Sequence, residues 1–181
     1  MAPPTRITIG AGNELLVLTN AAAVVAHAAY ALAARARLPD PYPIHFGTGG
    51  QPDRWVAADS PEWLLLPAIA AGTAVFMVLL PVLMPRIPMR LWNMPHKKRL
   101  MAAPRAARVR VVRTTVAMLL VLSLLNTVLM IWVQWMMVRA AQVGALQGVG
   151  ELGLLMVIYL GVIAGWIIHL YRVTGRLPEP G

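Results

Sequence analysis

The sequence predicts an all-α integral membrane protein with four transmembrane helices, both termini in the cytoplasm and one structured extracytoplasmic loop between helices one and two. Three observations predict this fold. The 181 residues are 59% hydrophobic and only 13% charged, which is too little polar surface for a soluble domain of this length. The apolar residues gather in four runs of about 20–25 residues, the length that a helix needs to cross a bilayer. The Lys and Arg residues are concentrated between the second and third runs.

The four runs are expected to form one membrane domain over residues 1–181. Because the runs are continuous and do not alternate between apolar and polar residues, each is expected to be a helix, which satisfies its own backbone groups in lipid. The expected helices span about residues 15–36, 62–85, 112–139 and 151–172, joined by an outer Pro/Gly loop over 37–61 and a basic cytoplasmic loop over 86–111.

The basic loop sets the predicted orientation. Between Arg86 and Arg113 the chain carries nine Lys and Arg residues and no acidic residue, and short basic loops stay in the cytoplasm. Topology and attraction to anionic lipid on the cytoplasmic side therefore account for the net charge of +9, and no nucleic-acid partner is expected. The residues expected to face lipid or a protein partner are Arg90, Lys97, Lys98, Arg99, Arg105 and Arg108.

Polar side chains recur inside the predicted membrane spans. Asn20 and His27 share one stripe of the first helix, and Asn126 and Gln134 share one face of the third. Counting from the cytoplasmic ends places His27 and Asn126 near mid-bilayer, with Thr73 of the second helix at a similar level. Because an unpaired polar group in hydrocarbon is costly, we expect His27 to pack against Asn126, with Thr73 nearby. His27 either joins two helices or has a functional role, and the sequence leaves both open.

The fourth helix carries Gly161 and Gly165 in GxxxG spacing. Small residues at this spacing let membrane helices approach closely. The pair predicts helix packing, either inside the protein or in a homo-oligomer.

The second helix has a clear start. Asp59 or Ser60 is expected to cap its N-terminus, Pro61 suits the first turn, and Glu62 complements the helix dipole. These residues are therefore interpreted as structural first.

The segment Leu38–Trp55, LPDPYPIHFGTGGQPDRW, is dense in proline, glycine and ionisable residues. Alternating prolines from Pro39 to Pro43 predict an extended, polyproline-like arm, and the glycines after Phe46 allow a tight reversal. An ordered arm, turn and second arm is expected rather than a passive linker. The residues expected to bind a ligand or partner are Asp40, Tyr42, His45, Phe46, Asp53, Arg54 and Trp55.

Two motifs resemble a known family. Pro39-Asp40-Pro41, Pro43-Ile44-His45-Phe46 and Gly49-Gly50-Gln51-Pro52-Asp53-Arg54-Trp55 are similar to the signature of a bacterial membrane domain of unknown function, number 1648 in that series, as found in Sdp-type toxin-immunity proteins. Asn93-Met94-Pro95-His96-Lys97-Lys98 resembles a stretch after the second helix of some members, although Arg99-Leu100 stands where Tyr-Trp is usual. The resemblance covers roughly the first helix through the start of the third.

The resemblance implies a small multi-pass protein of the bacterial plasma (inner) membrane. In the immunity members it implies protection against a secreted toxic peptide, sometimes with signalling to a cytoplasmic repressor held at the membrane. Many members have no assigned role, so the resemblance raises an immunity-like function without fixing it.

Three functions remain open. The preferred one is a non-enzymatic membrane protein whose outer loop recognises a peptide, an envelope component or a partner subunit. The second is a metal-binding protein or metalloenzyme, with His45 and Asp53 as candidate ligands beside Asp40. The third is a small transporter or accessory subunit that uses His27. No catalytic-triad order, phosphate-binding glycine loop, dinucleotide fingerprint or HExxH motif is present, and no cofactor is expected.

Overall fold

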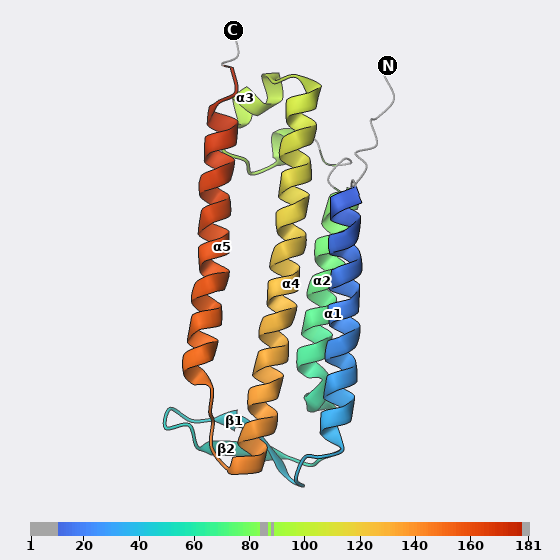
Figure 1. The fold of residues 1–181 in the computed structure, drawn as a ribbon, viewed down its shortest axis with the longest axis vertical. Helices are drawn as coiled ribbons and strands as arrows, with labels where there is room; N and C mark the ends of the chain where they lie inside the picture. The colour runs from blue at the N-terminus through green and yellow to red at the C-terminus, as the bar shows by residue number, and fades with distance from the viewer. Residues whose placement is uncertain (1–10, 84–86, 88, 179–181) are drawn as a thin grey trace.

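The structure, a computed structural model, describes residues 11–83, 87 and 89–178, which fold mainly into helices (Figure 1). Four helices are long and apolar enough to cross a membrane, which confirms the prediction of a multi-pass membrane protein. They are α1 (Ala11–Arg35), α2 (Leu65–Leu83), α4 (Arg105–Val143) and α5 (Val149–Gly175).

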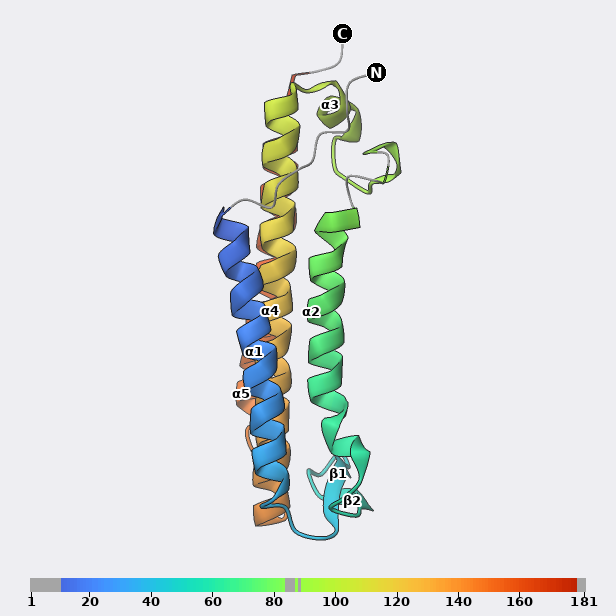
Figure 2. The same ribbon diagram turned by 90° about the vertical axis from the view of Figure 1, so that its right-hand side faces the viewer.

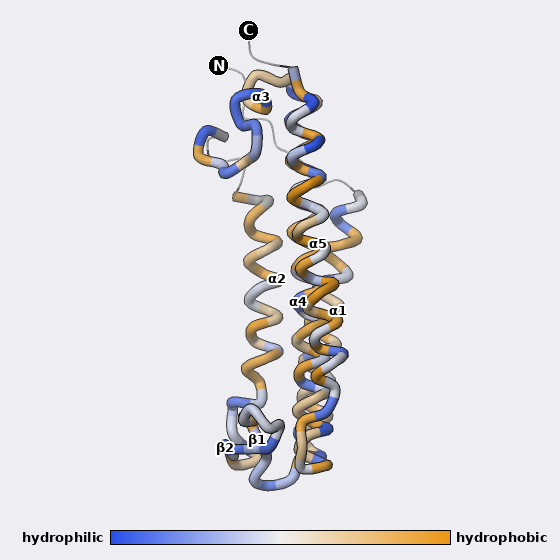
Figure 3. Tube along the Cα trace, turned by 90° about the vertical axis from the view of Figure 1, so that its left-hand side faces the viewer, coloured by the Kyte–Doolittle hydropathy of each residue, from blue (hydrophilic) through white to orange (hydrophobic). Residues whose placement is uncertain are grey.

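The two ends of the molecule differ in chemistry. One end carries a two-stranded hairpin of β1 (Tyr42–Phe46) and β2 (Pro52–Val56) and is called the hairpin end. The other carries the short helices η3 (Met89–Leu91) and α3 (Lys97–Ala102) and is called the basic end. Figure 3 shows hydrophobic residues through the middle of the helices and hydrophilic residues gathered near α3 and in the hairpin.

Helix α4 is the centre of the bundle. It contacts α1, α2 and α5, whereas α5 contacts only α4 and α3 among the described elements. Figure 1 accordingly shows α5 on the opposite side of α4 from α1, and Figure 2 shows α1 and α2 on either side of α4.

Helices α1 and α4 run parallel and share a polar seam. The Asn13 amide donates to the carbonyl of Arg113 at 3.3 Å, and the Asn20 amide donates to the carbonyl of Leu120 at 3.0 Å. Asn13, Asn20 and His27 follow one another at seven-residue spacing, which keeps one helix face toward its partner in a left-handed crossing. The predicted stripe through Asn20 and His27 is therefore the face that α1 presents to α4.

The hairpin end has its own apolar core. Ala31 and Ala34 of α1, Tyr42 of β1 and Trp63 form one buried cluster. The rings of Tyr42 and Trp63 meet edge to face with centroids 5.6 Å apart, and the Trp63 indole N–H donates to the carbonyl of Ala31 at 2.6 Å. Trp63 therefore fixes the hairpin to α1 through packing and through one buried hydrogen bond.

A short 3-10 helix, η1 (Pro61–Leu64), leads into α2. Its cap is Ser60, whose Oγ accepts from the backbone N–H of Glu62 at 3.3 Å. Of the two caps that the sequence offered, the structure uses Ser60, and Pro61 stands in the first turn as predicted.

The predicted polyproline-like arm differs from the structure in its second half. The chain is extended there, but from Tyr42 onward it pairs with β2 as an antiparallel strand, with Tyr42 opposite Val56. Pro43 lies opposite Trp55, and the register shifts directly after it, as expected where a proline has no N–H to donate. The reversal predicted from the glycines includes Gly50, whose φ of +73° suits glycine.

The segment predicted as a loop over 86–111 is partly helical. Besides η3 and α3, it contains the first residues of α4, which begins at Arg105 and follows Pro104 at the N-cap position. Val111 and Val112 are buried while Arg105 and Arg110 are exposed. This helical periodicity explains why the basic residues extend α4 rather than form a loop.

The GxxxG pair of α5 is not used for packing within the described residues. A Cβ built at Gly161 or at Gly165 would meet nothing within 4 Å. Within the described residues, neither glycine is therefore needed for a close approach between helices, and its use in a homo-oligomer stays a prediction.

Candidate functional site

A cavity of about 280 Å³ lies between the hairpin, the start of α2 and α4. We call it the hairpin cleft. It is lined by Tyr42, Ile44, Arg54, Glu62, Trp63, Leu65, Leu66, Val133, Gln134 and Met137. Most of these side chains are apolar, and the volume is slightly below the ~300–1,000 Å³ of a small-molecule pocket. The cleft is therefore sized for an apolar side chain rather than for a large ligand.

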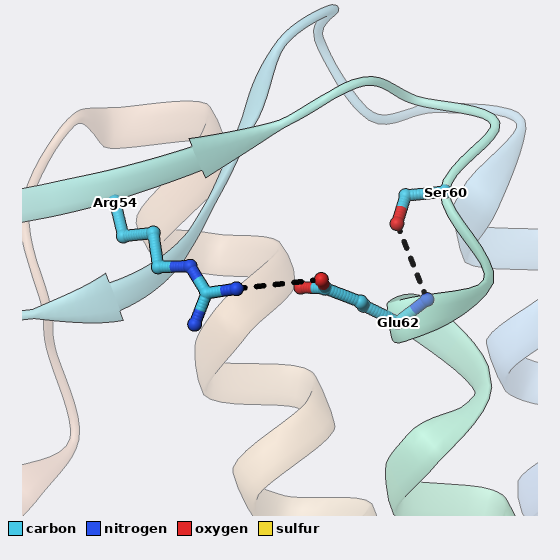
Figure 4. Close-up of polar contacts among 3 residues, drawn as sticks. All are labelled: Arg54, Ser60 and Glu62. Carbon is cyan, nitrogen blue, oxygen red and sulfur yellow. Dashed lines mark hydrogen bonds and ion pairs between the residues drawn. The ribbon is translucent and has the colours of Figure 1, made fainter.

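Two opposite charges stand at the rim of the hairpin cleft. Arg54 of β2 reaches toward Glu62 of η1, with its Nη2 3.4 Å from Oε1, and Figure 4 shows the two side chains pointing toward one another. The Arg54 side chain is 65% exposed and that of Glu62 is 42% exposed. An exposed pair at this distance contributes little stability, so either group is available to a charged ligand at the mouth of the cleft.

The floor of the hairpin cleft is a buried chain of hydrogen bonds. Gln134 of α4 has no exposed surface, and its Oε1 lies 3.2 Å from His27 Nε2. Its amide Nε2 donates to the carbonyl of Trp63 at 3.1 Å. His27, Gln134 and Trp63 thus connect α1, α4 and the segment that returns from the hairpin.

No hydrogen bond joins His27 to Asn126, its predicted packing partner, within the described residues. His27 bonds Gln134 instead, and the buried Nδ2 of Asn126 has no hydrogen-bond partner among the described residues. The prediction counted residues from the cytoplasmic end of each helix, and so placed each side chain at the same depth as its own Cα. The long Gln134 side chain reaches back toward the preceding turns of α4, so it meets a histidine that lies further from the hairpin end. Thr73 is half-buried in α2, and no hydrogen bond joins its side chain to His27 within the described part of the chain.

Tyr42 belongs to the core of the hairpin rather than to its exposed face. The sequence places it among residues that contact a ligand on the loop surface, but its side chain has no exposed area. Burial raises the pKa of the Tyr42 phenol above its usual value. A ligand reaches Tyr42 only by entering the hairpin cleft, which its side chain helps to line.

The exposed face of the hairpin carries a second pair. His45 Nδ1 lies 2.6 Å from Asp53 Oδ1, and the two side chains are 66% and 49% exposed. Among the described residues, Asp53 thus pairs with His45 rather than with its neighbour Arg54. Trp55 is also exposed, while Phe46 is half-buried. These residues remain available to a partner that covers the outside of the hairpin.

Asp40 has a structural role in the connection that leads back to η1. Its Oδ1 accepts from the backbone N–H of Ala58 at 3.0 Å. Arg35, at the end of α1, donates to the carbonyls of Ala58 and Asp59. Sequence reasoning missed this use of Arg35, which reads simply as the charge that ends the first apolar run.

The candidate metal ligands do not converge. His45 and Asp53 bond each other, whereas Asp40 is engaged with the backbone of Ala58. Within residues 11–83, 87 and 89–178, no three His, Asp or Glu side chains are grouped to hold a metal ion.

At the basic end, the Asn93–Lys98 motif holds α3 against the end of α5. His96 has φ +48° and its Nδ1 lies 3.2 Å from the hydroxyl of Thr174, which is fully buried. Arg99 donates to the carbonyl of Gly175 at 2.6 Å. Sequence reasoning missed Thr174, because nothing near it in the chain indicates a partner.

The predicted lipid-facing basic residues fall into two groups. Three donate hydrogen bonds inside the basic end, namely Lys97 to the carbonyl of Arg90, Arg99 to that of Gly175 and Arg108 to that of Met101. The other three, Arg90, Lys98 and Arg105, are exposed. The segment is therefore a folded cap on the basic end as well as a source of positive charge.

Comparison with known families identifies one part of the chain. Residues 22–71 match the model described as "Domain of unknown function (DUF1648)", which confirms the predicted resemblance to this domain over that segment. The matched segment runs from α1 through the hairpin into α2 and includes much of the hairpin cleft. It ends before Asn93–Lys98, so the second motif lies outside it. Neither a curated protein nor a solved structure matches the chain.

Proposed function

We propose that this protein is a non-enzymatic, multi-pass protein of the bacterial plasma membrane that recognises a polypeptide at the hairpin cleft. The observation that carries the proposal is the cleft itself, an apolar cavity with one positive and one negative group at its mouth. Among a peptide, an envelope component and a partner subunit, a polypeptide segment fits this chemistry best. An apolar side chain would fill the cavity while a neighbouring charge exchanges partners with Arg54 or Glu62.

The distribution of charge supports a hairpin that faces out of the cell. The described basic segment from Arg90 to Arg113, which includes η3, α3 and the start of α4, lies at the opposite end of the bundle from the hairpin, and a short basic segment stays in the cytoplasm. A ligand in the cell envelope would then reach the hairpin first. An immunity-like or signalling-like role follows from the same proposal, because a secreted peptide approaches from that side.

The rigid attachment of the hairpin also supports recognition. Trp63 and Arg35 connect the hairpin and its return segment to α1 through three backbone carbonyls. Gln134 of α4 donates to a fourth carbonyl, that of Trp63, and the rings of Tyr42 and Trp63 make one buried contact. A pre-formed cavity binds with a smaller loss of conformational entropy than a mobile loop does. The cleft therefore has the preorganisation that a binding site needs.

Photo-crosslinking in living cells tests this proposal. A photoreactive amino acid at Leu66 lies in the wall of the hairpin cleft, whereas one at Ile69 lies on an exposed part of α2 outside it. We expect an adduct of one defined polypeptide from position 66 and only lipid adducts from position 69. Arg54→Ala should weaken the polypeptide adduct, because it removes the positive group at the rim.

Two results would contradict the proposal. One is a set of adducts that is the same at positions 66 and 69. The other is a polypeptide adduct at position 66 that persists when Val133→Trp fills the cleft. Thermal unfolding of each variant provides the control that the bundle is intact.

A further inference from the structure

A second concavity lies between α4 and α5 toward the basic end. Its wider part, about 530 Å³, has Arg110 and Thr114 on the α4 side and Trp166, His169 and Arg176 on the α5 side. A smaller part, about 340 Å³, continues between the same helices and shares Thr114, Trp166 and His169 with the wider one. The two parts therefore form one continuous depression, which we call the α4–α5 groove.

The two parts of the α4–α5 groove differ in charge. The wider part carries the guanidinium groups of Arg110 and Arg176, and no Asp or Glu lines it. Both arginines are exposed, and neither belongs to an ion pair among the described residues. The smaller part contains no Lys, Arg, Asp or Glu. Gly165 helps to open it, because a Cβ at this position would meet nothing within 4 Å.

The position of this charge matches the level of lipid head groups. Arg110 precedes the longest apolar stretch of α4, and Arg176 directly follows the last residue of α5. Trp166 stacks on His169 with ring centroids 5.5 Å apart between these arginines and the apolar part of the groove. Tryptophan prefers the boundary between head groups and hydrocarbon. The groove thus runs from head-group depth into the hydrocarbon layer.

We propose that the α4–α5 groove binds one anionic phospholipid of the leaflet at the basic end. Its phosphate lies between Arg110 and Arg176, which bind phosphate oxygens through charge-assisted, bidentate hydrogen bonds. One acyl chain lies along the smaller, apolar part past Gly165. Basic depressions between membrane helices at this depth suit anionic head groups, and a zwitterionic head group leaves part of the arginine charge unmatched. The proposal goes beyond recognition at the hairpin cleft and does not depend on it.

Native mass spectrometry of the purified full-length protein with added phosphatidylglycerol or phosphatidylcholine tests the site. We compare Arg110→Gln/Arg176→Gln with Arg90→Gln/Lys98→Gln, which removes the same charge from exposed positions outside the groove. We expect one retained phosphatidylglycerol, and about tenfold weaker retention in the groove variant, because hydrogen bonds to charged groups are strong. The control variant should stay within about twofold of the wild type.

Gly165→Leu tests the acyl-chain part separately, because the Cβ of a residue at this position meets nothing within 4 Å and the larger side chain takes up space in the groove. It should weaken phosphatidylglycerol retention while circular dichroism shows unchanged helix content. Equal retention of the two lipids, equal loss in the two double variants, or unchanged retention in Gly165→Leu would each overturn the proposal. A dimer that excludes lipid would also overturn it and would assign the groove to a second copy of the chain.

Discussion

His27 of α1 and Gln134 of α4 meet inside the bundle, where the imidazole Nε2 lies 3.2 Å from the amide Oε1 and neither side chain has exposed surface. Because an amide oxygen can only accept, His27 carries a proton on Nε2. The amide nitrogen of Gln134 in turn donates to the carbonyl of Trp63, which sets the orientation of the amide. This contact joins the seam between two parallel helices to the floor of the hairpin cleft.

Removing His27 should destabilise the fold. His27→Ala leaves Gln134 Oε1 buried without a donor, and a buried group that loses its partner costs about 1–3 kcal/mol. We expect a decrease of this size in the free energy of unfolding, measured in detergent micelles by reversible denaturation. Thr73→Ala is the matched control, because Thr73 is half-buried and bonds neither His27 nor Gln134, and it should change stability by about 0.5 kcal/mol or less.

A double-mutant cycle separates this contact from general packing. His27→Ala and Gln134→Ala should be non-additive by about 0.5–3 kcal/mol, since the two side chains are in direct contact. If the decreases in the free energy of unfolding caused by the two single substitutions were additive, the hydrogen bond would not be a stabilising interaction.

The hairpin should loosen when the indole N–H of Trp63 is removed. Trp63→Phe keeps an aromatic ring against Tyr42 but loses the hydrogen bond to the Ala31 carbonyl. A loss of about 1 kcal/mol corresponds to about fivefold faster amide hydrogen exchange in residues 42–56. Trp55→Phe is the control, because Trp55 is 49% exposed and has no such bond among the described residues. Equal exchange rates in the two variants would contradict this role.

Alkaline pH should destabilise the hairpin through Tyr42. Burial raises the pKa of the Tyr42 phenol above its usual value of 10.0, so the folded protein holds this proton more tightly than the unfolded chain does. The stabilisation is complete below about pH 10 and is lost as pH rises through the folded-state pKa. Phenolate absorbance should therefore show a late-titrating tyrosine that is missing from Tyr42→Phe. If both proteins gave the same titration curve, the burial of Tyr42 would be in doubt.

The basic end should depend on the backbone conformation of His96. Its φ of +48° is unfavourable for β-branched residues and tolerated by asparagine. His96→Val should therefore cost about 1–2 kcal/mol more than His96→Asn, although both lose the contact with Thr174. Limited proteolysis of residues 89–104 should be faster in the valine variant. Equal cleavage in both variants would mean that the left-handed conformation does not hold α3 in place.

The parts of the fold that depend on local sequence were predictable. Hydropathy and length are properties of each run, so the four spans and the apolar character of the protein could be read directly. The cap at Ser60 and the stripe through Asn20 and His27 follow from spacing within one helix. The turn at Gly50 follows from the conformational freedom of glycine.

The parts that depend on distant residues were not predictable. Tyr42 is buried because Trp63, far along the chain, packs against it, and Gln134 reaches His27 only because α1 and α4 run parallel. The hairpin cleft takes its lining from five separate elements, β1, β2, η1, α2 and α4. The pattern of residues within one helix or strand does not reveal a cavity that several elements form together. The docking of His96 on Thr174 is hidden for the same reason.

Site-specific labelling of single cysteines tests the orientation on which outward recognition depends. The chain has no cysteine, and both Thr48 in the hairpin turn and Lys98 in α3 are exposed. With an impermeant thiol reagent, Thr48→Cys should react on intact cells, whereas Lys98→Cys should react only after the membrane is opened. Labelling of Lys98→Cys on intact cells, with Thr48→Cys protected until the membrane is opened, would place the hairpin inside the cell and contradict the account.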